Sequence, residues 1–163
     1  MNSEQKILND FQKLLEDQLG KEKAVELKRK VLSAYFDEKI KKKSIDEADQ
    51  FRVDSFRVRS FVDRIVTYTD KIPTSKQNLN LLLNLAELSL TKGELFLSSD
   101  LYSQVLFKTI KSEKYAEERA FAFVGLGEIS SNQAKWEESF SYVRKAKKMF
   151  EKSQNFIGIA KCE

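Results

Sequence analysis

The chain repeats a pattern of residues at a spacing of 41 positions, and this repeat limits the folds open to it more than any other feature. The segment LGEISSNQAKWEES, from Leu126 to Ser139, places a helix end, a short turn and a new helix start close together. The segment LAELSLTKGELFLS, from Leu85 to Ser98, has the same order of large, small and polar residues. Residue class matches better than identity, which is typical of helical repeats.

Paired positions of the repeat predict how the two helices of one hairpin pack. Small residues occupy two of the pairs, where they allow the helices to approach closely. Large residues occupy a third pair, where we expect them to hold the start of the second helix over the first. The small pairs are Ala86 with Gly127 and Ser98 with Ser139, and the large pair is Leu95 with Trp136.

Glycine and proline are scarce. Five Gly and one Pro in 163 residues indicate long helices joined by short turns, since β-rich folds use both residues at every hairpin. An apolar fraction of 41% with 33% charged residues is that of a soluble globular chain. The first residues lack the apolar core of a secretion signal, and no apolar run is long enough to span a membrane. We therefore expect a cytoplasmic location and no membrane contact.

Apolar residues at helical spacing predict an all-α chain. We expect residues 1–72 to form an N-terminal segment of about three helices, for capping or docking, and residues 75–163 to form the repeats. The run at 78–90 is apolar nearly all round, so it should be buried on several sides. The expected helices span about 4–19, 21–42, 44–69, 78–90, 94–111, 113–132 and 135–152, with one more starting at 156.

Several kinds of chemistry are excluded or weakened by the residues that are missing. The chain has no His, which removes Ser-His and Cys-His catalysis and imidazole metal ligands. Cys162 is the one cysteine, so no disulfide can form within the chain. Glu87 and Glu128 lie one repeat apart, about 10 Å for neighbouring helices, at the far edge of what carboxylate catalysis uses. We expect no enzymatic activity, no metal and no cofactor.

The repeat resembles the tetratricopeptide repeat (TPR). The better copy is Phe123-x-x-Leu126-Gly127 with Ser139-x-x-x-Val143, and the second is Leu82-x-x-Leu85-Ala86 with Ser98-x-x-x-Tyr102. The resemblance implies antiparallel helical hairpins stacked as a right-handed solenoid, with repeats at 75–112 and 113–153 and the start of a third at 156–163. Ala160 lies 40 residues after Ala120, so this third copy has only begun at Glu163. We expect the chain to be the N-terminal part of a longer repeat or signalling protein.

The resemblance also implies a ligand-binding groove, because the first helix of each TPR hairpin lines the concave side. The implied groove has an apolar floor and two carboxylates, which suits an amphipathic helix or an extended peptide with apolar anchors and a Lys or Arg. The carboxylate-clamping subclass of the family is excluded, since Glu87 and Glu128 would repel a C-terminal carboxylate. The implied groove residues are Asn80, Leu83, Glu87, Leu90, Phe121, Val124, Glu128, Ser131 and Lys161.

Two alternatives to this protein-binding scaffold stay open. Nucleic-acid binding, RNA included, would use the basic run Lys39–Lys43 and the Arg-rich segment Phe51–Val62. We interpret Lys39–Lys43 and a second basic run, Arg144–Lys148, mainly as cations near helix C-termini, where they complement the helix dipole. Self-assembly would use the open C-terminal end or a contact patch at Val53 and Phe56, which point away from the main apolar stripe of their helix.

Overall fold

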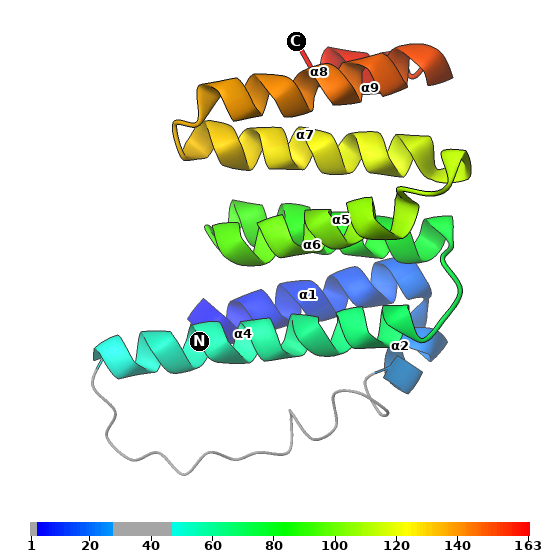
Figure 1. Cartoon of the computed structure of the whole chain (residues 1–163). Helices are drawn as coiled ribbons and strands as arrows, with labels where there is room; N and C mark the ends of the chain where they lie inside the picture. Colours follow the sequence, from blue (N-terminus) through cyan, green and yellow to red (C-terminus); the bar gives the residue numbers. More distant parts are fainter. Residues whose placement is uncertain (1–2, 28–46) are drawn as a thin grey trace. The chain divides into compact units, whose positions relative to one another are not determined.

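The computed structural model describes residues 3–27 and 47–163 (Figure 1), and every regular element in those ranges is helical. The chain divides into two compact units, Met1–Thr74 and Ser75–Glu163. The expected helix at 21–42 is described only as far as residue 27, and Lys39–Lys43 lie outside the described residues. The side chains of Val53 and Phe56 also lie outside the described part, so the proposed patch there stays a prediction.

The first unit contains α1 (Ser3–Leu19), α2 (Lys21–Leu27) and α4 (Glu47–Asp70). Gly20 separates α1 from α2 with a φ of +78°, a backbone conformation that residues other than glycine rarely adopt. Helix α1 contacts both α2 and α4. The rings of Phe11 and Phe61 stack with centroids 5.9 Å apart, and both side chains are fully buried. Phe61 therefore belongs to the centre of this core.

The second unit consists of two helical hairpins followed by a short helix. Helices α5 (Lys76–Thr91) and α6 (Leu95–Thr109) form the first hairpin, and α7 (Ala116–Asn132) and α8 (Trp136–Ser153) form the second. A 3-10 turn, η2 (Glu113–Tyr115), precedes α7, and α9 (Phe156–Ala160) follows α8. Each helix packs on the next one, and α5 also contacts α7 directly. The two first helices are thus neighbours in space, with α7 and α8 forming the upper layer in Figure 1.

The two hairpins have the same internal hydrogen bonds at positions 41 residues apart. The hydroxyl of Ser98 donates to the carbonyl oxygen of Ala86 over 2.8 Å, and that of Ser139 donates to the carbonyl oxygen of Gly127 over 2.8 Å. A Cβ on Gly127 would lie 2.9 Å from Cγ2 of Val143, closer than real Cβ atoms approach. The prediction that small residues at these positions let the helices meet is confirmed.

The prediction for Trp136 is wrong. Its side chain is 58% exposed, and Phe140 one turn later is 62% exposed. Trp136 is the first residue of α8, and the turn before it, residues 132–135, is itself exposed. The side chain is therefore covered only in part at that end of the hairpin, and most of it faces solvent.

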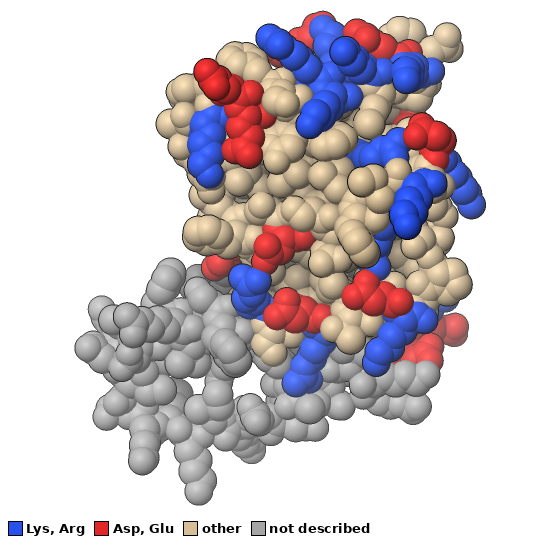
Figure 2. Space-filling view, viewed as in Figure 1, with Lys and Arg blue, Asp and Glu red and all other residues tan. Residues whose placement is uncertain are grey.

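The interpretation of the basic run Arg144–Lys148 as helix-end cations is wrong, because the run lies inside α8 and not in its last turn. Helix α8 continues to Ser153, and Lys152 is the basic residue of its last turn. Within the run, Lys147 pairs with Glu163 at 3.2 Å, and Lys145 lies over the rings of Phe123 and Tyr142 at 5.6 and 5.7 Å. Figure 2 shows Lys and Arg side chains gathered over α8.

The run expected to be buried on several sides is α5. Seven of its sixteen residues are buried, including Leu79, Leu82 and Leu85. Its N-terminus is capped by Ser75, whose hydroxyl accepts a hydrogen bond from the backbone N–H of Asn78 at 3.2 Å. Among the described helices none is long and apolar enough to cross a membrane.

A buried arginine ties the second hairpin to the first. Arg119, in α7, donates to the carbonyl oxygen of Thr109 over 2.9 Å and to that of Ile110 over 3.4 Å, at the end of α6. Its guanidinium also pairs with Glu113 at 2.9 Å. The last carbonyls of a helix lack partners within the helix, so Arg119 supplies donors that α6 cannot supply itself and holds the two hairpins in register.

Candidate functional site

A pocket of about 460 Å³ opens between α5 and α7 in the second unit. Helix α5 contributes two amides, one apolar side chain and a carboxylate, and α7 contributes an aromatic ring, an apolar side chain, a glycine and a carboxylate. One residue comes from α6, and one lies directly after α9. The lining residues are Asn80, Leu83, Asn84, Glu87, Tyr102, Phe121, Val124, Gly125, Glu128 and Lys161.

Most of the groove residues expected from the sequence meet at this pocket. Seven of the nine line it, and the two that do not are Leu90 and Ser131. Each of these lies three residues beyond the carboxylate of its helix, and both are half-buried. The structure therefore brings together the two carboxylates, the apolar floor and Lys161, and leaves the last turn of each first helix outside.

Sequence reasoning missed Tyr102, Asn84 and Gly125. Tyr102 is the large second-helix residue of the TPR-like pattern, equivalent to Val143 in the second hairpin, and the resemblance does not place that position in the groove. A hydroxyl where the other copy has a plain aliphatic side chain was the available signal. Asn84 carried no comparable signal, since its position one turn before Leu88 is typical of an ordinary helix surface. Gly125 gave no signal by itself, because its role is to leave room for the Tyr102 ring.

Tyr102 reaches the pocket because α7 has a glycine opposite it. Three ring atoms of Tyr102 lie within 2.6 Å of the position that a Cβ on Gly125 would occupy. The ring is thus set directly against the α7 backbone, and the side chain is only 5% exposed. Any larger residue at position 125 would displace the ring and fill part of the pocket.

The pKa of Tyr102 reflects the burial and the charges at the pocket. Burial raises the pKa of the Tyr102 hydroxyl far above its usual value of 10, and the negative charges of Glu87 and Glu128 raise it further. Both carboxylates belong to solvent-exposed residues on neighbouring helices. Tyr102 therefore stays neutral at physiological pH, and its hydroxyl can both donate and accept a hydrogen bond.

Lys161 stands at the edge of the pocket, held there by the way α9 docks. The side chain of Asn155 caps α9 by accepting from the backbone N–H of Gly158 at 2.9 Å, and its amide donates to Glu117 over 3.3 Å. Gly158 lies so close to the Phe150 ring that any Cβ there would clash. The α9 segment is thus fixed at its start and at its middle, and Lys161 follows directly after its last residue.

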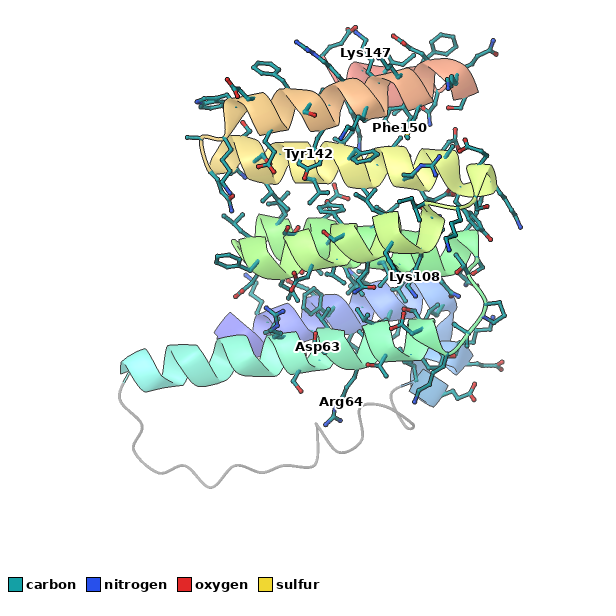
Figure 3. All side chains as sticks on the ribbon, viewed as in Figure 1. Asp63, Arg64, Lys108, Tyr142, Lys147 and Phe150 are labelled. Atoms are coloured by element: carbon teal, nitrogen blue, oxygen red, sulfur yellow. The ribbon has the colours of Figure 1, made fainter. Side chains whose placement is uncertain are left out.

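Aromatic contacts join this edge to the core. Phe150 points from α8 toward α7 (Figure 3) and meets the ring of Phe121 edge-on, with centroids 4.9 Å apart. The ammonium of Lys161 lies 5.6 Å from the centroid of Phe121, within the range of a cation–π contact. One wall of the pocket is therefore an aromatic ring that already faces a cation.

The side chains of the pocket offer both apolar surface and hydrogen-bonding groups for a ligand. The described residues contain no group of three or more His, Cys, Asp and Glu side chains placed to hold a metal ion. Leu83 and Val124 offer apolar surface, and the carboxylates, the amides and the Tyr102 hydroxyl offer hydrogen-bond acceptors. Such a mixture is typical of sites that bind an extended polypeptide with one charged side chain.

A second depression lies on the outer surface of α8. It measures about 420 Å³ and is lined by Glu137, Phe140, Ser141, Arg144, Lys145 and Lys148. All of these residues come from one helix, so this is a feature of the helix surface and not a cleft between elements. It combines an exposed aromatic side chain with three cations.

Comparison of the chain with models of protein families, with curated proteins and with solved structures gives no match. The function of the pocket is therefore argued from its own residues.

Proposed function

We propose that residues 75–163 are a TPR-like, right-handed solenoid segment that binds a peptide or helix of a partner protein without catalysing a reaction. Two observations support the solenoid. The hairpins carry equivalent Ser-to-carbonyl hydrogen bonds 41 residues apart, and the first helices contact each other. In TPR-like arrays, first helices stacked in this way line the concave, ligand-binding side.

The pocket between α5 and α7 carries the proposal. Seven residues chosen from the sequence as groove-facing line one cavity of about 460 Å³. A volume of this size takes a few side chains of a bound segment. An apolar floor beside two carboxylates selects a segment that has both an apolar anchor and a cationic side chain. The partner is thus a polypeptide defined by these two features.

Selection from a displayed random-peptide library tests this function. Peptides enriched on the wild-type chain are remeasured by fluorescence anisotropy against Val124→Asp, which places a charge on the apolar floor. The control is Phe107→Asp, because Phe107 is 78% exposed on α6 and does not line the pocket. We expect the Val124 variant to lose binding at least tenfold and the control to keep it. Equal binding by both variants would move the site away from the groove, and no enriched peptide would refute the function.

Nucleic-acid binding is a second candidate, and the outer surface of α8 favours it. Arg144, Lys145 and Lys148 line a depression together with exposed Phe140, and exposed Trp136 lies one turn before Phe140 in the same helix. Cations interleaved with aromatic side chains suit single-stranded nucleic acid. Trp136 is the one tryptophan of the chain, so its fluorescence reports directly on this surface. Quenching by a single-stranded RNA oligonucleotide that weakens steeply with salt would support this function. Unchanged fluorescence at low salt would remove it.

A further inference from the structure

No hydrogen bond joins the hydroxyl of Tyr102 to another described residue, although the residue as a whole is only 5% exposed. The hydroxyl oxygen is not one of the fully buried polar atoms that lack a partner, so it is open to the pocket. Phenylalanine would make the same ring contact with Gly125 and would avoid placing a polar group there. Because the hydroxyl lines the pocket, water or a ligand that enters the pocket can supply its hydrogen-bond partner.

The charges around the hydroxyl indicate the sign of that ligand. Glu87 on α5 and Glu128 on α7 both act on Tyr102 strongly enough to oppose its ionisation. Lys161 is the one cation among the residues that line the pocket, and its ammonium lies over the Phe121 ring and not against a carboxylate. Neither Glu87 nor Glu128 has an ion pair among the described residues. The lining of the pocket therefore carries two carboxylates without an ion pair against one ammonium, and it favours a cation.

The distribution of the acceptors distinguishes between the two cationic side chains. They come from three helices: Asn84 and Glu87 from α5, Tyr102 from α6 and Glu128 from α7. An ammonium is a compact charge with three donors, whereas a guanidinium has five donors in one plane that reach acceptors on several sides. The apolar side chains of Leu83 and Val124 can cover the aliphatic stem of an arginine.

We propose that this pocket binds the guanidinium group of an arginine side chain, with Glu87 and Glu128 on its two sides and the Tyr102 hydroxyl at its floor. The inference rests on the proposed peptide-binding function and specifies the residue that the partner presents. It also assigns Tyr102 a role in binding that packing alone does not require.

Nuclear magnetic resonance titration with three blocked amino acids tests the proposal. The probes are N-acetyl-arginine amide, N-acetyl-lysine amide and N-acetyl-citrulline amide, the last of which has nearly the shape of arginine without its charge. We expect the arginine probe to shift the signals of Glu87, Gly125 and Glu128 saturably, with a dissociation constant on the order of 1 mM, as for a single small contact. The lysine probe should bind at least about threefold more weakly, because an ammonium has fewer donors, and citrulline should give no saturable shift.

Variants separate the site from general attraction to a negative surface. Tyr102→Phe should weaken arginine binding about threefold to tenfold, the effect of one hydrogen bond, without moving the fold. Glu87→Gln with Glu128→Gln should abolish it. The matched control is Glu137→Gln with Glu151→Gln, since both residues are exposed on α8 and neither lines the pocket. The control makes the same change in net charge and should leave binding unchanged.

Three results would overturn the guanidinium site: no saturable shift with the arginine probe, equal binding of citrulline, or lysine binding as tight as arginine. Its failure can be told from failure of the peptide-binding function. A groove-binding library peptide whose arginine can be replaced by citrulline without loss keeps the function and refutes the site. A saturable arginine shift without any selected peptide supports the site and refutes the function.

Discussion

The ring of Tyr102 in α6 lies directly against the backbone of Gly125 in α7, in the space that a side chain at position 125 would occupy. The two hairpins are therefore in close contact at this pair. Both residues also line the pocket. Because the ring is rigid and buried, neither partner can move away cheaply. Stability and pocket shape are therefore coupled at this pair, and substitutions here test both.

Gly125→Ala should destabilise the chain by about 1 to 3 kcal/mol, the range for overpacking a filled interior. The added methyl group would overlap the Tyr102 ring, which must rotate into the pocket or push α6 away from α7. Urea unfolding measures the loss. In a Tyr102→Ala background the same substitution should cost almost nothing, because the overlapping ring is gone. A full cost in that background would contradict the packing explanation.

Tyr102→Phe should leave the free energy of unfolding within about 0.5 kcal/mol of the wild type, or raise it, since it removes a hydroxyl without a partner on the protein. Tyr142→Phe is the matched control. Burial raises the pKa of the Tyr142 hydroxyl, and the charge of Glu138 and its interaction with the hydroxyl raise it further. Removing this hydroxyl should cost about 0.5 to 1 kcal/mol. Equal losses in the two variants would show that Tyr102 has a partner in the free protein.

Tyr102 should also make the chain sensitive to alkali. In the unfolded chain a tyrosine loses its proton near pH 10, whereas burial and the charges of Glu87 and Glu128 hold the folded pKa well above that value. Below pH 10 both states bind the proton and the group adds no pH dependence. Above pH 10 the unfolded state alone is deprotonated, so stability falls, by at most about 1.4 kcal/mol per pH unit. Urea unfolding at increasing pH should show this fall in the wild type and a smaller one in Tyr102→Phe.

Local patterns in the sequence were sufficient to predict the helices and most of the residues that line the pocket. They did not predict contacts between residues far apart in the chain. The helix expected at 94–111 is found at Leu95–Thr109 because Gly93 marks its start in the chain. Glu87 and Glu128 line the same pocket because a fixed repeat puts equivalent residues on one face. Tyr102 was not recognised, since its place at the pocket depends on a glycine in the next hairpin.

For Trp136 the prediction was wrong because it relied on the repeat alone. Its equivalent, Leu95, is half-buried, and residue class alone predicted the same for a larger side chain. A tryptophan needs more surrounding surface than a leucine to be buried, and the end of the second hairpin does not offer it. Repeat patterns therefore predict where a side chain starts, and not how much of it the neighbours can cover.

The turns of the two hairpins differ at one residue that can be exchanged. Gly93 has a φ of +82°, and its equivalent Ala134 has a φ of +58°, a conformation that costs a residue with a Cβ about 1 to 2 kcal/mol. Ala134→Gly should therefore stabilise the chain by about 0.5 to 1 kcal/mol after the entropy of the unfolded glycine is included. Gly93→Ala should destabilise it by a similar amount, since open space surrounds its position and the effect is confined to the backbone. Thermal unfolding of both variants should show shifts of opposite sign, and shifts of the same sign would refute this explanation.

Lys161 offers the sharpest test of charge in the pocket. Its ammonium lies over Phe121 and shares the cavity with Glu87 and Glu128, so it repels any cation that enters. Lys161→Met keeps an unbranched side chain that can remain on the aromatic wall and removes the charge. We expect the affinity for N-acetyl-arginine amide to rise about twofold to threefold, the effect of one partly exposed like charge. Lys152→Met, in the exposed last turn of α8, makes the same change in net charge outside the pocket and should change nothing. A fall in affinity for Lys161→Met would mean that Lys161 contributes to holding the ligand instead of repelling it.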